Sequence, residues 1–442
     1  MMQKSCYINK KSYYINTYGC QMNVHESEKM AGILSDRGFV AADRIEDADI
    51  IIYNTCCVRN TAETKVFGHL GRAKKLKEER RDIKIILCGC MSQQGGAAED
   101  IMKRYPFIDI IIGTHNISQL GEYLDKTKFI EIWESAKEGN DREVDIKPKR
   151  ERSVNAWINI MYGCNNFCSY CIVPFVRGRE RSRSIDEILD EIKELLDSGY
   201  KEITLLGQNV NSYSFNEFKF INLLQKIREL KGKFRLKFLS AHPKDLSDEV
   251  IKIISETDSF SKNIHLPIQA GSDRILSLMN RGYTAKGYLE KIDMMRELMP
   301  NIGISTDIMV GFPTETETEF LDTMNLIDKV RFDNIFSFIY NKRSGTAADK
   351  MDGQIKRDIK IDRIQRLIRQ QSEIGLELAK SYIGKEFEVL VEFQKGTKCI
   401  GKTDSGKPVS FESDESMFNK FIKIKITDSK NTGLIGTHEK NR

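Results

Sequence analysis

The stretch Gly163-Cys164-Asn165-Asn166-Phe167-Cys168-Ser169-Tyr170-Cys171 directly follows an apolar run, Ala156–Tyr162, with the composition of a buried strand. Three cysteines spaced C-x3-C-x2-C on one short loop can direct their sulfurs at a single inorganic centre. The next cysteine is Cys399, so the sequence offers no nearby fourth sulfur. A structural zinc site needs four closed ligands, whereas a [4Fe-4S] cluster on three thiolates leaves one iron open. The loop therefore favours a cluster, with zinc as the alternative if a distant His or Cys completes the set.

The cysteine loop stands near the start of a long alternation of strand-like and helix-like segments. Helical patterns such as Ile185–Leu196 and Phe218–Leu230 separate the strands. The predicted strands are Ala156–Tyr162, Glu202–Leu206, Leu236–Ser240, Asn263–Ile268, Gly303–Val310 and Asn334–Tyr340. Such an α/β series predicts an open parallel sheet or a partial (β/α)6 barrel, with functional groups at the carboxyl ends of the strands.

A separate alternation precedes the loop. Apolar runs at Tyr13–Tyr18, Asp49–Asn54, Lys84–Leu87 and Ile108–Ile112 are each followed by polar or glycine-containing residues. With helical patterns between them, they predict a parallel α/β domain over residues 1–130. The polar, charged segment 131–153 has the composition of a solvated linker.

The sequence pattern changes toward the end of the chain. A long helical pattern at Arg357–Ala379 closes the second domain, 154–380. Short strand-like runs separated by turn residues follow, and they predict a small antiparallel β-barrel over 381–442.

A second set of cysteines follows strands of the first domain. Cys20, Cys56 and Cys90 come directly after the first three predicted strands. Because the carboxyl ends of parallel strands share one edge of a sheet, three cysteines far apart in sequence can meet there. Cys57 and Cys88 are close neighbours of these positions, and periodicity alone does not choose between Cys56 and Cys57. The pattern predicts a second three-thiolate site.

Composition and charge limit the classes of protein that the chain can belong to. Ten cysteines in 442 residues are too sparse for a disulfide scaffold, and metal ligation or redox chemistry explains them better. The net charge of +5 is small, so a nucleic-acid partner would have to be bound by a local patch. No apolar run approaches the roughly 18 to 20 residues that span a bilayer, and we predict a cytoplasmic location with no membrane partner.

The cysteine patterns resemble those of a known enzyme group. C-x3-C-x-aromatic-C after a strand is similar to the signature of the radical S-adenosylmethionine (SAM) superfamily. Asn54-Thr55-Cys56-Cys57-Val58-Arg59 resembles an N-T-C-x-V-R pattern and selects Cys56, and a G-C-M/V pattern selects Cys90. Further blocks resemble the MiaB-type methylthiotransferases of tRNA, namely Tyr18–Asn23, Gly178–Arg183, Leu206–Tyr213 and His265–Gln269.

This resemblance implies a domain plan and a chemistry. The N-terminal cluster domain, radical SAM core and C-terminal TRAM module would carry two [4Fe-4S] clusters, one at Cys20, Cys56 and Cys90 and the other at Cys164, Cys168 and Cys171. SAM would bind the open iron of the second cluster, with Tyr170 near its adenine. The implied partners are a tRNA anticodon stem-loop, a reductant such as flavodoxin or ferredoxin, and a sulfur donor.

The implied reaction converts N6-isopentenyladenosine at tRNA position 37 to its 2-methylthio derivative. Two other targets of such enzymes stay open, threonylcarbamoyladenosine in tRNA and an aspartate of a ribosomal protein. A non-catalytic iron–sulfur protein that binds RNA or transfers electrons is the alternative from another class.

Polar residues at strand ends are candidates for ligand contact. Gln208 and Asn209 lie at the end of a predicted strand, and Gln269 and Asp307 lie in or beside later strands, where these side chains could bind SAM or substrate. A turn role is the alternative for the first two. The run Arg177–Arg183 carries four arginines and favours an anionic substrate near the loop, with internal ion pairing as the alternative.

Overall fold

The computed structural model describes residues 11–57, 60–133, 146–150, 153–430 and 433–438, and of 60–64 only the backbone. Cys6, the pair Val58-Arg59 and residues 134–145 and 151–152 of the predicted linker lie outside the described residues. The chain forms two compact units, which are described separately. The first contains residues 1–151, 162–165 and 172–180, and the second contains the rest.

The first unit is built on a parallel sheet of six strands in the order β2-β1-β3-β4-β5-β6. The strands are β1 Ser12–Thr17, β2 Val40–Ala41, β3 Ile50–Thr55, β4 Lys84–Gly89, β5 Ile110–Ile112 and β6 Phe129–Glu131. The helices are α1 Gln21–Asp36, α2 Asn60–Glu79, α3 Ala97–Arg104, α4 Leu120–Tyr123 and α5 Val173–Arg177.

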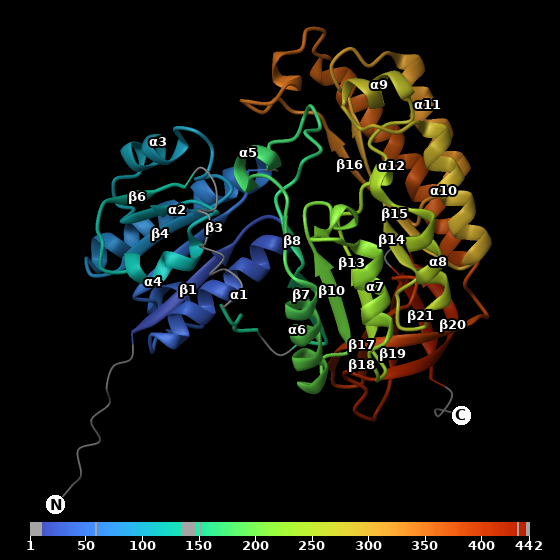
Figure 1. The fold of residues 1–442 in the computed structure, drawn as a ribbon, viewed down its shortest axis with the longest axis horizontal. Helices are drawn as coiled ribbons and strands as arrows, with labels where there is room; N and C mark the ends of the chain where they lie inside the picture. The colour runs from blue at the N-terminus through green and yellow to red at the C-terminus, as the bar shows by residue number, and fades with distance from the viewer. Residues whose placement is uncertain (1–10, 58–59, 134–145, 151–152, 431–432, 439–442) are drawn as a thin grey trace, which may run out of the picture. The chain divides into compact units, whose positions relative to one another are not determined.

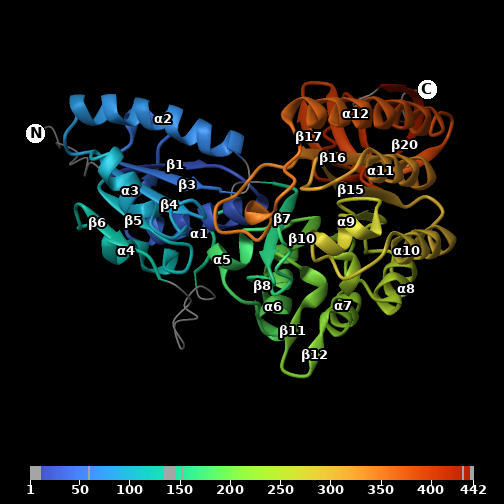
Figure 2. The same ribbon diagram turned by 90° about the horizontal axis from the view of Figure 1, so that it is seen from above.

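Helices cover both faces of this sheet (Figure 2). Successive residues of a strand point to opposite faces, and β3 shows the consequence. Ile51 and Tyr53 pack toward α2 and α3, while Ile50 and Ile52 pack toward α1 and α4. Both faces are therefore apolar, and only the edge at the strand ends is left for polar chemistry.

The second unit begins with six parallel strands in two groups of three, β13-β10-β7 and β14-β15-β16 (Figure 1). An isolated parallel bridge joins Leu236, within the edge strand of the first group, to Phe260. The strands are β7 Asn155–Asn159, β10 Glu202–Leu206, β13 Arg235–Phe238, β14 Asn263–His265, β15 Gly303–Val310 and β16 Asn334–Ile339. The helices are α6 Ile185–Asp197, α7 Phe220–Arg228, α8 Asp248–Glu256, α9 Asp273–Leu278, α10 Ala285–Leu298, α11 Glu317–Val330 and α12 Arg357–Lys380.

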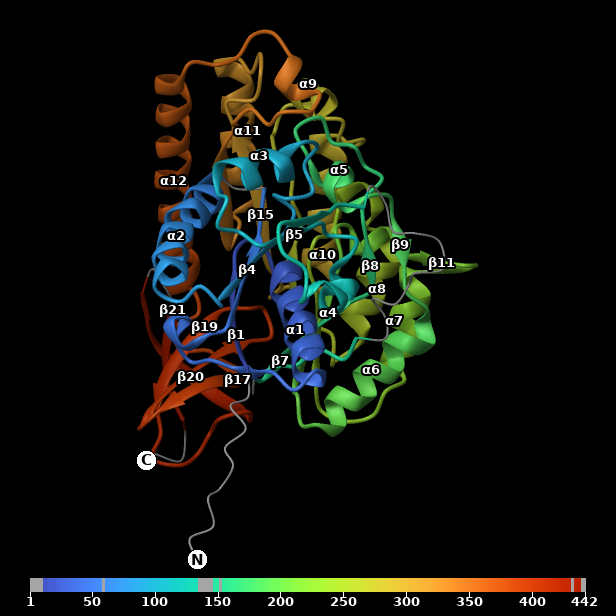
Figure 3. The same cartoon turned by 90° about the vertical axis from the view of Figure 1, so that its left-hand side faces the viewer.

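The same unit ends in a closed five-stranded barrel of order β17-β18-β19-β21-β20 (Figure 3). Its strands are β17 Glu386–Lys395, β18 Lys398–Thr403, β19 Pro408–Glu412, β20 Phe421–Lys430 and β21 Gly433–Thr437. Polar contacts fix the barrel to the α/β part. Ser261 donates to the carbonyl of Asp404 at 2.6 Å, and Lys407 pairs with Asp333.

The predicted architecture is confirmed, with differences in detail. The predicted strands of both α/β regions are present. The structure adds β2, β6, the hairpin β11 Ser214–Phe215 with β12 Phe218–Lys219, and the short β8 Met161–Tyr162 and β9 Arg181–Ser182, which are too short to show a pattern in sequence. The barrel is not wholly antiparallel, because β19 and β21 pair in parallel. None of the described helices is long and apolar enough to cross a membrane.

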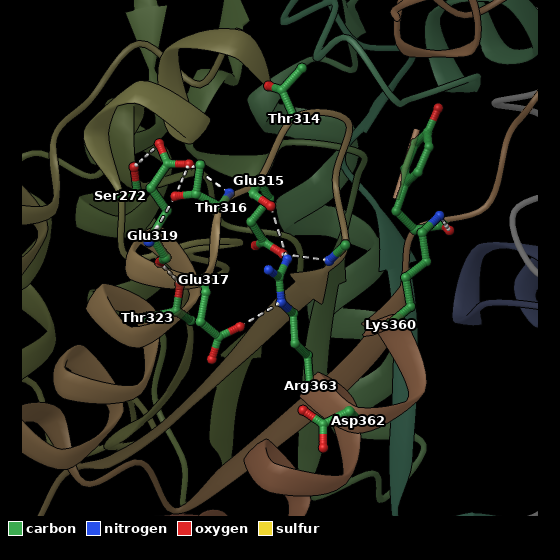
Figure 4. Close-up of polar contacts among 12 residues, drawn as sticks. Ser272, Thr314, Glu315, Thr316, Glu317, Glu319, Thr323, Lys360, Asp362 and Arg363 are labelled. Atoms are coloured by element: carbon green, nitrogen blue, oxygen red, sulfur yellow. Dashed lines mark hydrogen bonds and ion pairs between the residues drawn. The ribbon is translucent and has the colours of Figure 1, made fainter. Parts of the chain in front are cut away.

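A buried ion pair fixes the turn after β15 (Figure 4). Glu315 is 3% exposed and accepts a 2.7 Å hydrogen bond from the backbone N–H of Gly311. Arg363 of α12 is 4% exposed and donates to the same carboxylate at 2.8 Å. Burial raises the pKa of Glu315, and the Gly311 N–H and Arg363 act in the opposite direction. The pair therefore joins the long helix to the strand end.

Arg363→Leu should destabilise the second unit strongly, because Glu315 would remain buried without its counter-charge. The expected loss in free energy of unfolding is about 3–5 kcal/mol. Denaturant unfolding followed by circular dichroism measures it. Arg366→Leu is the matched control, since Arg366 pairs with Glu317 at the surface and should contribute about 0–1 kcal/mol. Equal effects of the two variants would contradict the assigned role of the pair.

Candidate functional site

Three cysteines of the first unit lie at the carboxyl ends of adjacent parallel strands. Cys20 follows β1 as the residue before α1, Cys56 directly follows β3, and Cys90 directly follows β4. The strands neighbour one another in the order β1-β3-β4. The predicted meeting of these cysteines at one sheet edge thus has its structural basis in the strand order.

Gly19 packs closely against Cys56 at this edge. Gly19 has φ +109°, and a Cβ built on it would stand 2.8 Å from the sulfur of Cys56. Only glycine therefore fits at position 19, next to Cys20 in sequence and against Cys56 in space. Asn23 of α1 donates to the carbonyls of Tyr18 at 2.8 Å and Thr55 at 3.0 Å, which ties the loop after β1 to the end of β3.

Cys57 and Cys90 form a second close contact. The hydrogen bond from the Cys57 thiol lowers the pKa of Cys90 to about 7, against the opposing effect of burial, and Arg177 adds to the lowering. The same bond to Cys90, together with burial, raises the pKa of Cys57. The thiolate form is thus favoured most at Cys90.

Arg177 is a residue of this site that the sequence did not place there. It is 6% exposed, and its Nε donates to the Cys90 sulfur at 3.2 Å. Its Nη2 donates to Asn23 at 2.9 Å and to Glu26 at 3.1 Å, and Nη1 makes a further contact with Glu26. A fixed positive charge therefore lies against the cysteine edge.

The donor set at this edge suits an iron–sulfur cluster. Three thiolates can bind three irons of a [4Fe-4S] cluster and leave the fourth iron open. A structural zinc site needs four closed ligands. The set of three thiolates therefore fits a cluster better than a closed zinc site.

The cysteine loop after β7 contributes residues to both units. Cys164 belongs to the first unit, where its backbone N–H donates to the carbonyl of Gly178 at 3.1 Å. Cys168 and Cys171 belong to the second unit, and the N–H of Cys171 donates to the carbonyl of Cys168 at 2.9 Å. Asn280 donates to the carbonyls of Asn166 at 3.1 Å and Phe167 at 3.0 Å, so the loop backbone is held from outside.

A second buried arginine contacts this loop. Arg281 is 5% exposed and donates to the sulfur of Cys168 at 3.2 Å and to the hydroxyl of Tyr170 at 3.4 Å. Its other nitrogens donate to Tyr283 at 2.9 Å and to the carbonyl of Pro267 at 3.0 Å. Burial raises the pKa of Tyr170, which stays a neutral phenol beside the cysteines. Arg281 stands within one turn after α9 and was not singled out by any sequence pattern.

The predicted polar residues fall into two groups. Gln208 and Asn209 follow β10, and Asn209 donates to Asp245 at 2.7 Å in the loop after β13. Gln269 has φ +72° and forms a parallel bridge beside Asp307, whose carbonyl accepts from the Gln269 N–H at 2.9 Å. Asp307 lies 3.5 Å from His265 Nε2. The structure thus brings Gln269 and Asp307 together, and Asn209 separately contacts Asp245.

Buried polar atoms at the strand ends of the second unit mark a place for a ligand. Within the described part of the chain, the following have no hydrogen-bond partner: both amide atoms of Asn159 and Asn211, Asn209 Oδ1, Ser169 Oγ and His242 Nε2. Burial, helped by Arg281 and Lys244, lowers the pKa of His242 to about 2, so it is neutral. Its Nδ1 accepts from the Lys244 N–H at 3.2 Å, which leaves Nε2 as the protonated atom. Buried polar atoms without hydrogen bonds reduce the stability of the fold unless a bound group supplies the missing hydrogen bonds.

Two arginines of the run Arg177–Arg183 are paired inside the protein instead of being available to an anionic substrate. Arg177 is directed to Glu26 and Cys90, as described above. Arg183 donates to Glu191 at 2.7 Å and to the carbonyl of Asn159 at 2.8 Å. Both guanidiniums already have acceptors inside the protein, so the prediction that they bind an anionic substrate is wrong for these two residues. The alternative of internal ion pairing holds for them.

Comparison with protein families divides the chain into three matches. Residues 158–327 match the Radical SAM superfamily, residues 12–113 match the Uncharacterized protein family UPF0004, and residues 380–437 match the TRAM domain. Among solved structures, the radical SAM methyltransferase TsrM from Kitasatospora setae aligns with a TM-score of 0.57 at 13% identity, over 88% of this chain and 79% of that chain. This likeness concerns the fold.

Relatives in sequence extend over nearly the whole chain. A protein of Acetivibrio thermocellus named tRNA-2-methylthio-N(6)-dimethylallyladenosine synthase is 45% identical over 97% of this chain and 91% of its own length. A protein of Carboxydothermus hydrogenoformans with the same name is 47% identical over 95% of this chain and 98% of its own length. With both cysteine sets present at strand ends, the chain belongs to the radical SAM methylthiotransferase family that includes these synthases.

Proposed function

We propose that this enzyme converts N6-isopentenyladenosine (N6-dimethylallyladenosine) at tRNA position 37 to 2-methylthio-N6-isopentenyladenosine. The observation that carries the proposal is the 45% and 47% identity, over nearly the full length, to synthases named for this nucleoside. The C-terminal barrel supports an RNA substrate, since residues 380–437 match the TRAM domain.

We assign the ligands of two [4Fe-4S] clusters to the two cysteine sets. Cys20, Cys56 and Cys90 would hold one cluster at the edge of the first sheet, and Cys164, Cys168 and Cys171 would hold the other. When bound, the clusters and SAM supply the radical that removes hydrogen from C2 of the adenine and the methylated sulfur that replaces it. The protein must position these groups and exclude water from them.

The residues of the second unit have roles that follow from their contacts. Arg281 would fix Cys168 and Tyr170 beside the open iron. The buried polar atoms of Asn159, Asn209 and His242 would bind SAM, because a charged, polar ligand satisfies them. Gln208, Gln269 and Asp307 remain proposed contacts of SAM or substrate, and Tyr170 remains a proposed neighbour of the SAM adenine.

The remaining partners are proposed from the chemistry. Cleavage of SAM needs an electron, so a flavodoxin- or ferredoxin-type reductant is required, and the methylthio group needs a sulfur donor. The RNA partner is the anticodon stem-loop, and we place the reaction in the cytoplasm with the tRNA. Threonylcarbamoyladenosine in tRNA or a ribosomal aspartate are the competing targets of the same chemistry, and a non-catalytic iron–sulfur protein is the competitor from another class.

Deletion of the gene should abolish 2-methylthio-N6-isopentenyladenosine in cellular tRNA and leave N6-isopentenyladenosine in its place. Mass spectrometry of digested tRNA measures both nucleosides. Complementation with the parent chain is the control. An unchanged level of the methylthiolated nucleoside would refute the substrate, and absence of SAM cleavage by the reduced protein would refute the reaction class.

The two cysteine sets should lose iron independently. Replacement of Cys20, Cys56 and Cys90 by Ala, or of Cys164, Cys168 and Cys171 by Ala, should each remove about half of the iron and sulfide, because each set holds one cluster. Anaerobic iron and sulfide analysis measures this. Cys399→Ala, in the C-terminal barrel, is the matched control and should keep both clusters. One cluster's worth of iron in the parent protein would contradict the assignment.

Asn209→Leu should weaken binding of SAM to the cluster-loaded enzyme. The lost hydrogen bond to a charged ligand is worth about 1.5–3 kcal/mol, or about 10- to 100-fold in Kd. Anaerobic titration calorimetry with SAM measures it. Gln225→Leu, on the exposed face of α7, is the control of the same kind. An unchanged Kd for Asn209→Leu would remove this residue from the SAM site.

A further inference from the structure

We propose that Arg177 is a positioning residue that holds Cys90 in place and raises the reduction potential of the cluster bound by Cys20, Cys56 and Cys90. The inference rests on the proposed ligand set. Arg177 lies outside both cysteine patterns, and its hydrogen bonds to Cys90, Asn23 and Glu26 all lie within the first unit.

The geometry of Arg177 leaves little freedom for its guanidinium. The bidentate contact with Glu26 and the hydrogen bond to Asn23 use the two Nη atoms, so Nε is directed at the sulfur of Cys90 at 3.2 Å. The helix that carries Arg177 is itself anchored, since Thr114 donates to the carbonyl of Val176 at 2.6 Å. Both Ile172 and Val176 pack in the core of the first unit.

Charge explains why this contact would matter to a cluster. Reduction adds a negative charge, and a hydrogen-bond donor or positive group at a ligand sulfur stabilises the reduced state more than the oxidised one. Arg177 and Glu26 are both more than nine-tenths buried, so water screens neither charge well. Arg177 should therefore raise the potential, and Glu26 should lower it.

The second cluster provides a matched comparison in the same chain. Arg281 donates to the sulfur of Cys168 at 3.2 Å, the distance found between Arg177 and Cys90. Each predicted cluster thus has one buried arginine on one ligand sulfur. Loss of Arg177 should affect only the cluster of the first sheet, and loss of Arg281 only the other.

The test measures the potential of one cluster at a time in the full chain. In a background with Cys164, Cys168 and Cys171 replaced by Ala, a redox titration followed by electron paramagnetic resonance gives the potential of the remaining cluster. The iron content of this background is measured first. Absence of iron would refute the proposed ligand set of Cys20, Cys56 and Cys90. A cluster that is present but does not respond to Arg177 would refute only the role of Arg177.

Three variants in this background should differ in the reduction potential of the cluster. Arg177→Gln should shift the potential to a more negative value, and Glu26→Gln should shift it to a more positive one. The double variant removes both buried charges, so neither is left unpaired, and its potential should lie between the two. A purely structural role for Arg177 would produce no such pair of opposite shifts.

The potentials of these variants decide the proposal. An Arg177→Gln variant at the potential of the background or of the Glu26→Gln variant overturns it, and so does a double variant at the potential of the Glu26→Gln variant. Loss of iron from both Arg177 variants, with circular dichroism unchanged and iron retained in Glu26→Gln, supports the role in holding Cys90. Arg281→Gln in the complementary background, with Cys20, Cys56 and Cys90 replaced by Ala, should shift the other cluster's potential to a more negative value. An Arg177→Gln variant that shifts the potential in this complementary background overturns the assignment to Cys90.

Discussion

The structure depends on one property of parallel sheets: the carboxyl ends of adjacent strands share a single edge. Helices cover both faces of the first sheet with apolar side chains, so reactive groups can collect only at this edge. Cys20, Cys56 and Cys90 follow three adjacent strands and therefore lie at one sheet edge although they are far apart in sequence. The same property places the cysteine loop and the candidate SAM residues at the strand ends of the second unit.

Buried arginines form a second layer around the cysteines. Arg177 and Arg281 each donate to one sulfur, and their remaining nitrogens are held by acceptors of the protein. A buried guanidinium is tolerated only with such partners, so these residues are fixed where a cluster of negative thiolates would need them. The cysteines would provide the bonds to iron, and the arginines would set the electrostatic surroundings in which the iron works.

The described part of the second unit also has buried polar atoms without hydrogen-bond partners at the ends of its strands. Asn159 ends β7, and Asn211 and His242 follow the neighbouring strands β10 and β13. Among the described residues, both amide atoms of Asn159 and Asn211 and the Nε2 of His242 are buried without a hydrogen-bond partner. The neutral state of His242 follows from burial and from the nearby Arg281, so its Nε2–H can only donate. A ligand with both donors and acceptors would satisfy these atoms, and SAM is the ligand that we propose here.

The sequence by itself determined the succession of strands and helices and the loop that carries Cys164, Cys168 and Cys171, because periodicity and spacing are local properties. Family resemblance selected Cys56 over Cys57, selected Cys90, and added the reaction. Tertiary structure alone decided the place of Arg177: in sequence it is one arginine of an exposed-looking run, yet its contacts are with Glu26 and Cys90, which are 151 and 87 residues away. The burial of a charge depends on partners that only the folded chain brings together, and no local pattern records them.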